Sequence, residues 1–252
     1  FMFCENVGFE ENYVTYAGYK ELIRKYKINS LVETDSIIER QRMIKDKDEI
    51  SKIQRACEVT DECFKYLQTY IKPGMTEKQI AEEIDNYYKH HADGVSFETI
   101  VASGENSSKP HAVPTDRKIQ EEDIITIDMG CKVDGYCSDM TRTIFVGSVP
   151  EYVKPVYDLV LKKQQQVLEE MKDGESTRFL TTMVENDFKL EGYDLIHALG
   201  HGVGMEIHEA PYISHRFDVP LKENMIVTNE PGIYIPGRFG VRIEDTVQLT
   251  KF

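Results

Sequence analysis

Four acidic residues occupy matching places in two similar stretches of the chain. Asp128 lies in the segment IITIDMG, which aligns with the segment IVTNEPG around Glu230. A second pair of segments, GYCSDMT and GVRIEDT, aligns Asp139 with Glu244 in the same way. Each half of this internal repeat therefore offers two carboxylates at corresponding positions.

Four converging carboxylates require a cation. Like charges about 4 Å apart repel by about 4 kcal/mol at an effective dielectric constant of about 20. Two divalent ions would balance the four negative charges. Taken singly, each acid could be an ordinary solvated surface residue, but Asp128 and Glu230 both end apolar runs that should be buried. An oxygen-rich site with an imidazole favours manganese, cobalt or zinc, and manganese is our first choice.

Three histidines lie in segments that are typical of sites. His201 is flanked by glycines in GHGVG, where the backbone can approach a metal or a substrate closely. His208 precedes an acid in HEAP, and His111 lies in a loop rich in serine and proline. A lone histidine is more often structural than a ligand, but three of them beside two acidic pairs favour a metal site. We interpret His197 as a packing residue or as one that supports a ligand.

The periodicity of apolar residues predicts an α/β fold made of two similar halves. Helical spacing is followed by strand-like runs in each half. Helices are expected over 13–26, 48–71, 76–87, 153–171 and 176–188, and strands near residue 8 and over 31–33, 97–102, 124–129, 141–146, 226–229 and 241–249. Thr76 and Gln79 form a capping-box pattern at the start of one of these helices.

Composition limits the classes of partner. The chain has 252 residues, of which 44 are acidic and 30 basic, giving a formal net charge of -14 that disfavours nucleic acid and anionic membranes. No apolar stretch approaches the roughly 20 residues that span a bilayer. Five dispersed cysteines without a Cys-x-x-Cys pair are typical of a reducing, cytoplasmic protein.

The first 45 residues hold too few elements for a domain of their own. We expect them to be the end of a larger α/β domain, followed by a charged linker over 40–49. Residues 46–252 should form the catalytic domain.

Six short blocks resemble prolidases and aminopeptidases P, the Xaa-Pro branch of the M24 metallopeptidases. The resemblance runs in order over 48–249. The blocks are 108–112 (SKPHA), 128–130 (DMG), 138–143 (SDMTRT), 200–204 (GHGVG), 230–232 (EPG) and 241–245 (VRIED). The resemblance implies a pita-bread fold, with two pseudo-symmetric halves around a dinuclear site, and implies that residues 1–45 end a creatinase-like N-terminal domain.

The resemblance also implies roles for individual residues. Asp128 would bind one metal ion, His201 and Glu230 the other, and Asp139 and Glu244 both. A hydroxide bridging the two ions would attack the peptide carbonyl.

Further residues are expected around this centre. His111 and His208 would bind and stabilise the substrate carbonyl, and Glu230 would also transfer a proton. Arg242 would orient a neighbouring carboxylate, with a solvent-facing strand arginine as the alternative. Candidates for an apolar wall that accepts the proline ring are Tyr136, Tyr212 and Phe97, and Arg216 is a candidate partner for a dipeptide's carboxylate.

The flanks of the ligands favour bonds to proline as the substrate. Methionine aminopeptidases share the five ligands but differ around the residues that correspond to His111 and Glu244. Three alternatives stay open: a catalytically silent pita-bread binding module, a methionine aminopeptidase-like enzyme and a creatinase-like enzyme. Short proline-containing peptides are the expected partners, a homodimer is compatible with the resemblance, and the choice between dipeptidase and aminopeptidase stays open.

Overall fold

The computed structural model describes residues 6–26, 28 and 30–251, which divide into two compact units. The smaller unit, Phe1–Arg42, holds the parallel strands β1 (Asn6–Glu10) and β2 (Ser30–Thr34) with helix α1 (Tyr16–Tyr26) between them in sequence. Helix α2 (Ile37–Met43) leads to the larger unit, Met43–Phe252. No described helix has the length and apolar character needed to cross a membrane.

The first half of the larger unit packs two helices against short antiparallel strands. Its helices are α3 (Lys47–Tyr70) and α4 (Glu77–His91). Its main sheet has the order β4-β5-β8, made of β4 (Ile100–Ser103), β5 (Ile124–Met129) and β8 (Met140–Phe145). A smaller sheet joins β3 (Gly94–Val95), β6 (Cys131–Val133) and β7 (Tyr136–Cys137), and the short 3-10 helix η1 (Gly104–Ser108) follows β4.

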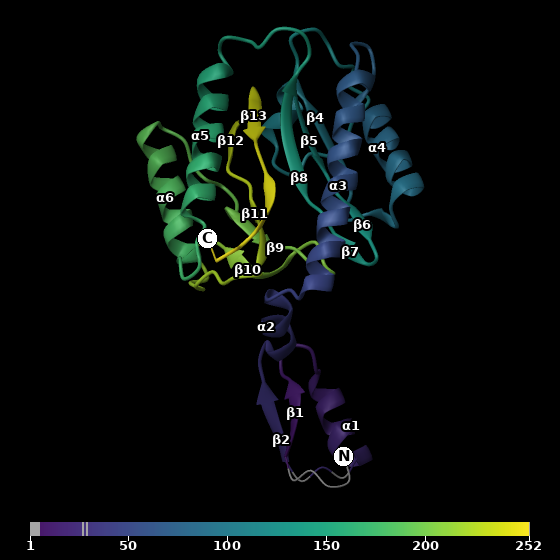
Figure 1. Cartoon of the computed structure of the whole chain (residues 1–252), viewed down its shortest axis with the longest axis vertical. Helices are drawn as coiled ribbons and strands as arrows, with labels where there is room; N and C mark the ends of the chain where they lie inside the picture. The colour runs from purple at the N-terminus through teal and green to yellow at the C-terminus, as the bar shows by residue number, and fades with distance from the viewer. Residues whose placement is uncertain (1–5, 27, 29, 252) are drawn as a thin grey trace. The chain divides into compact units, whose positions relative to one another are not determined.

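The second half repeats this order. Its helices are α5 (Lys154–Glu170) and α6 (Thr177–Leu190). Its main sheet has the order β10-β9-β11-β14, made of β9 (Gly200–Gly202), β10 (Glu209–Ile213), β11 (Ile226–Asn229) and β14 (Asp245–Gln248). The hairpin of β12 (Gly232–Ile235) and β13 (Phe239–Arg242) lies between β11 and β14 in sequence. In Figure 1 the helices of the two halves flank the strands from opposite sides.

Matching caps show that the repeat is structural. Thr76 caps α4 in a capping box with Gln79, and Ser176 caps α6 by accepting from Phe179 N. Each cap residue also forms an isolated antiparallel bridge, Thr76 to Lys118 and Ser176 to Pro220. The predicted repeat of two helices and a sheet is therefore confirmed.

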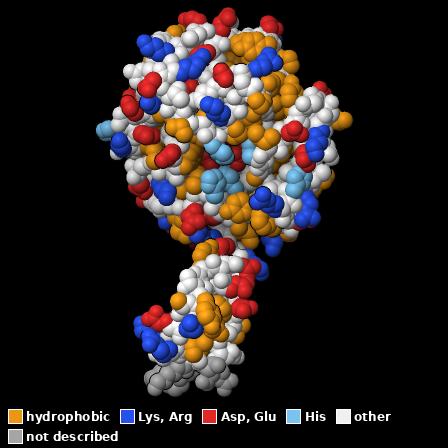
Figure 2. Space-filling view, turned by 180° about the vertical axis from the view of Figure 1, so that it is seen from behind, with side chains coloured by type: hydrophobic (Ala, Val, Ile, Leu, Met, Phe, Trp, Pro, Cys, Tyr) orange, Lys and Arg blue, Asp and Glu red, His pale blue; other side chains and the backbone are white. Residues whose placement is uncertain are grey.

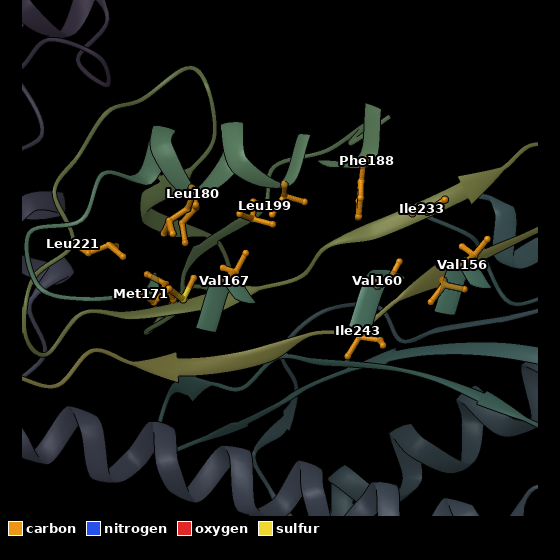
Figure 3. Close-up of a cluster of buried hydrophobic side chains, with 14 of the residues drawn as sticks. Val156, Val160, Val167, Met171, Leu180, Phe188, Leu199, Leu221, Ile233 and Ile243 are labelled. Carbon is orange, nitrogen blue, oxygen red and sulfur yellow. The ribbon is translucent and has the colours of Figure 1, made fainter. Parts of the chain in front are cut away.

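Each half has its own apolar core. One cluster packs α3 and α4 against β4, β5 and β8, and the other packs α5 and α6 against the second set of strands. Figure 3 shows part of the second cluster, where side chains of α5 such as Val160 and Val167 and of α6 such as Leu180 and Phe188 meet those of the strands. These two cores hold the sheets, and so the acids at the strand ends, in fixed positions.

Two predicted segments differ from the structure. The charged stretch 40–49 spans the boundary between the two compact units, after Arg42, but it is mostly helical: α2 continues to Met43, α3 begins at Lys47, and Asp46 and Glu49 form the capping box of α3. The predicted strand 241–249 is broken between β13 and β14. At the break Glu244 N donates to Thr141 O of β8, and the chain then continues as β14, which pairs with β11.

Candidate metal centre

A cleft of about 440 Å³ lies between the two halves of the larger unit. All five predicted ligands line it, together with His111, His197, His208 and Arg242. Figure 2 shows histidine side chains gathered on one face of this unit around a hollow with acidic side chains inside.

The ends of corresponding strands place the acids. Asp128 is on β5, paired with Thr141 of β8, while Asp139 lies in the short connection between β7 and β8. Glu230 directly follows β11, and Glu244 occupies the break between β13 and β14. The repeat thus brings two carboxylates from each half to one point.

His201 lies among these carboxylates. It is on β9, and its Nε2 is 3.4 Å from Glu230 Oε1 and 3.5 Å from Asp139 Oδ2. Asp139, His201 and Glu244 each offer one ligand atom, and these atoms lie within 4.8 Å of one another. His201 Nδ1 is 3.1 Å from Gly202 O. A proton on Nδ1 would bond this carbonyl, leaving Nε2 as an electron-pair donor toward the acids.

Two glycines allow His201 to reach this position. A Cβ on Gly200 would lie 2.0 Å from Thr228 O, and one on Gly202 would lie 2.3 Å from Ala210 O. Only glycine permits this close approach of β9 to both neighbouring strands, which explains the spacing of the GHG motif.

Burial dominates the electrostatics of the site. It raises the pKa of Asp139 and Glu244 well above their usual range, with neighbouring carboxylates adding to the effect. Burial likewise raises the pKa of Glu230, to about 7. Burial lowers the pKa of His201 to about 4, so its imidazole is neutral at neutral pH. The carboxylates are therefore costly to ionise together unless a cation balances them.

The donor set fits divalent metal ions. Asp128 Oδ1 and Glu244 Oε1 are buried and have no hydrogen-bond partner in the described part of the chain. Such oxygens are unfavourable in a folded protein unless they bind a cation or an ordered water. Carboxylate oxygens with one neutral imidazole are ligands that Mn²⁺, Co²⁺ and Zn²⁺ accept.

Arg242 connects the acids of the two halves. Its Nη2 donates to Asp128 Oδ2 at 2.7 Å, and its Nε donates to Thr141 Oγ1 at 3.0 Å. Thr141 Oγ1 in turn donates to Glu244 Oε2 at 2.6 Å. Arg242 is 4% exposed, so the alternative of a solvent-facing arginine is wrong.

Comparison with known proteins agrees with this architecture. The model of metallopeptidase family M24 matches residues 51–251. The chain belongs to metallopeptidase family M24. An Xaa-Pro dipeptidase of Pyrococcus furiosus is 39% identical over 250 residues, which are 98% of this chain and 72% of that protein.

Solved structures show that this M24 chain has the pita-bread fold. An X-Pro aminopeptidase from Thermotoga maritima has a TM-score of 0.90 and 37% identity, covering 98% of this chain and 71% of the other. The prolidase from Pyrococcus furiosus has a TM-score of 0.89 and 39% identity, covering 98% and 74%. The predicted family and fold are confirmed.

The structure brings most of the other predicted residues of this M24 chain to the cleft. His111, Tyr212 and Phe97 line it, and the ring of His208 lies 4.4 Å from that of His201. Burial lowers the pKa of His208 below its usual value, so this imidazole is neutral at neutral pH.

Two predicted substrate residues lie elsewhere. Tyr136 is not among the described residues that line the cleft, because its hydroxyl donates to Glu49 of α3 at 3.1 Å and its ring lies under Lys52. Arg216 is also absent from the described lining, since it is exposed in the loop that follows β10. Proximity in sequence to a motif was the ground for the prediction of Tyr136.

The structure places His197 in the cleft wall and adds Tyr234, which the sequence interpretation missed. His197 lines the cleft, and its Nε2 is 3.0 Å from Tyr234 Oη. Tyr234 accepts a hydrogen bond from Arg242 Nη1 at 2.7 Å. Burial lowers the pKa of His197 to about 4, so it is a neutral donor or acceptor at neutral pH.

Proposed function

We propose that this chain is a metal-dependent peptidase that hydrolyses Xaa-Pro bonds, in dipeptides or at the N-terminus of longer peptides. The observation that carries the proposal is a set of four carboxylates and one neutral imidazole in which Asp139, Glu244 and His201 are buried. Two carboxylate oxygens of this set have no hydrogen-bond partner in the described chain. Relatives named Xaa-Pro dipeptidase and X-Pro aminopeptidase support proline as the residue after the cleaved bond.

Two divalent ions would be held by the five residues of this cluster. We infer that Asp128 holds one ion, that His201 and Glu230 hold the other, and that Asp139 and Glu244 contact both. Mn²⁺ is the first ion to test. Divalent ions in such a site supply Lewis acidity, lowering the pKa of water and polarising a carbonyl oxygen.

The chain's own groups would handle the substrate. His111 and His208 line the cleft and would donate N–H groups to the scissile carbonyl as negative charge develops on its oxygen. Glu230 would accept a proton from the attacking water and return it to the leaving nitrogen. Arg242 keeps Asp128 oriented throughout.

The cleft wall suits a proline ring. A bond to proline is a tertiary amide without an N–H group, so recognition has to use the ring and the carbonyl groups. Phe97, Ile100, Ile207 and Tyr212 provide apolar surface for the ring.

Two further proposals concern the setting of the protein. The described cysteines Cys57, Cys63, Cys131 and Cys137 are all free, which supports a reducing, cytoplasmic compartment. A homodimer is also proposed, and sedimentation analysis of the purified chain tests it.

The deciding experiment measures metal binding and hydrolysis together. Metal-free protein is titrated with Mn²⁺, and release of alanine from Ala-Pro and from Ala-Pro-Ala is followed, with Ala-Ala-Ala as the control peptide. We expect two ions per chain, cleavage of at least one proline peptide and none of the control, and loss of both binding and cleavage in Asp139→Ala. A protein that binds two ions and cleaves neither proline peptide would sink the proposal.

A further inference from the structure

A buried ion pair lies directly behind the cleft histidines. Lys45 Nζ is 2.7 Å from Glu209 Oε1, and the two side chains are 1% and 7% exposed. Lys45 belongs to the short segment before α3, and Glu209 is the first residue of β10. The pair joins segments 164 residues apart in the chain. Burying two charges is costly, so the contact needs a reason beyond stability alone.

Glu209 determines how the segment that carries His208 is packed. Its carboxylate lies over Gly204, where a Cβ would be only 2.3 Å from Oε1. Its Oε2 accepts from Glu206 N at 3.5 Å. In the β-ladder Glu209 pairs with Gly202, which directly follows His201. Glu209 therefore contacts the middle of the segment 201–208 with its side chain and pairs next to His201 through its backbone, and the two ends of this segment carry the cleft histidines His201 and His208.

Lys45 anchors this arrangement to a second strand of the site. Its backbone N donates to Asn224 O at 3.0 Å, in the turn before β11. Val203 N then donates to Ile226 O of β11, the strand that ends just before Glu230. One lysine thus holds the turn that leads to Glu230 through its backbone and Glu209 through its side chain.

We propose that Lys45 and Glu209 are positioning residues that set the place of His208 in the cleft. Neither is among the described residues that line the cleft, so they act through the segment 203–209 and not on the substrate. The effect of this ion pair on catalysis rests on the proposed peptidase function. Its effect on the order of segment 203–209 is independent of that function.

A second buried lysine provides a matched control. Lys163 of α5 is 7% exposed and pairs with Asp187 of α6. Neither residue lines the cleft. Lys163→Met therefore breaks the ion pair of a buried lysine, whose acid partner is more exposed than Glu209, at 31%, without touching the proposed positioning contact.

The experiment compares Lys45→Met with Lys163→Met by amide hydrogen exchange and by kinetics on Ala-Pro-Ala. We expect Lys45→Met to speed exchange at Gly204 and Glu206 by at least about tenfold, while Lys163→Met leaves these amides within about twofold of the parent protein. In the Mn²⁺-loaded enzyme Lys45→Met should lower kcat by at least about tenfold, because small displacements of a catalytic group are costly. Lys45→Arg should restore most of the loss.

A background lacking His208 separates positioning from general weakening. In His208→Ala the further change Lys45→Met should alter kcat by less than about twofold, because coupled residues are not additive. If Lys45→Met does not fold, Glu209→Gln is measured in its place against the same predictions.

Two outcomes overturn the proposal. One is unchanged exchange at Gly204 and Glu206 in Lys45→Met. The other is a loss of kcat in the His208→Ala background as large as in the parent. If the parent protein cleaves no peptide, the proposed function fails, and the exchange rates still decide whether the ion pair positions the segment.

Discussion

Arg242 Nη2 lies 2.7 Å from Asp128 Oδ2, and this contact joins a strand of the second half to a strand of the first. The same guanidinium donates to Thr141, whose hydroxyl donates to Glu244. One buried side chain therefore fixes carboxylates on both sides of the cleft. A planar fork of donors is needed for this, and lysine cannot supply it.

Replacing this fork should weaken metal binding and catalysis together. We expect Arg242→Gln to lower metal affinity by about 10- to 100-fold, as loss of groups that orient ligands commonly does. Arg242→Lys should fall between the parent and the glutamine variant, because it keeps one charged donor. Titration calorimetry with Mn²⁺ and initial rates on Ala-Pro-Ala measure both effects, and parental affinity in Arg242→Gln would contradict this role.

The metal-free protein should become less stable as the pH rises. Folding raises the pKa of Asp139 and Glu244, and that of Glu230 to about 7. Below about pH 6.5 the lowered pKa values of His197 and His201 oppose this effect, because these histidines are protonated in the unfolded chain but not in the folded one. Above about pH 7 the histidines are neutral in both states and the folded chain holds more protons on its buried acids than the unfolded chain, so the free energy of unfolding falls as the pH increases. Thermal melts of the chelated protein at several pH values should show this decline.

Asp139→Asn is the control for that decline, because it removes one buried charge at nearly constant shape. At pH 8 the metal-free variant should melt about 2–4 °C above the parent for each kcal/mol of relieved repulsion. Saturating Mn²⁺ should make the parent the more stable of the two proteins. A hundredfold excess of Mn²⁺ over Kd raises the free energy of unfolding of the parent by about 2.7 kcal/mol, and that of the variant by far less. A parent that stays more stable at pH 8 without metal would refute the electrostatic argument.

Much of the fold and the centre could be predicted because the signals are local. The runs before Asp128 and Glu230 are buried strands in both halves, and short matches between the halves located all four acids. Glycines on both sides of His201 indicated the close backbone approach that the structure contains.

Contacts between distant segments could not be predicted in this way. Lys45 reads as part of a charged linker, although it is buried against Glu209. Tyr136 reads as part of a motif, although its hydroxyl reaches Glu49 on α3. In both cases the deciding partner lies far away in sequence, so no local periodicity reports it.

Tyr212 and Tyr136, the two tyrosines near the motifs, should have different effects on KM when each is replaced. Tyr212 lines the cleft and packs against Phe217 with ring centroids 5.8 Å apart, whereas Tyr136 lies outside the described lining. We expect Tyr212→Ala to raise KM for Ala-Pro-Ala by about tenfold, through loss of aromatic surface for the proline ring. Tyr136→Ala should leave KM within about twofold and lower only the melting temperature. Equal effects on KM would argue against this assignment of the wall.

The loop that carries His111 depends on Glu77, a fully buried acid in the first turn of α4. Its Oε1 accepts from the backbone N and the hydroxyl of Ser103, and its Oε2 accepts from Asn106 Nδ2 and from the N and hydroxyl of Thr115. These partners lie on both sides of His111 in sequence. Glu77 therefore ties the two ends of the loop together.

Glu77→Gln should loosen this loop while leaving the metal ligands in place. The new amide cannot accept at its nitrogen, so buried donors lose their partners at a cost of about 1–3 kcal/mol. We expect kcat for Ala-Pro-Ala to fall by about tenfold as His111 moves, while Mn²⁺ affinity stays within about twofold. Glu82→Gln, an exposed change on the same helix, should alter neither. If Glu77→Gln weakened metal binding as strongly as it slowed turnover, the acid would support the whole centre, not the His111 loop alone.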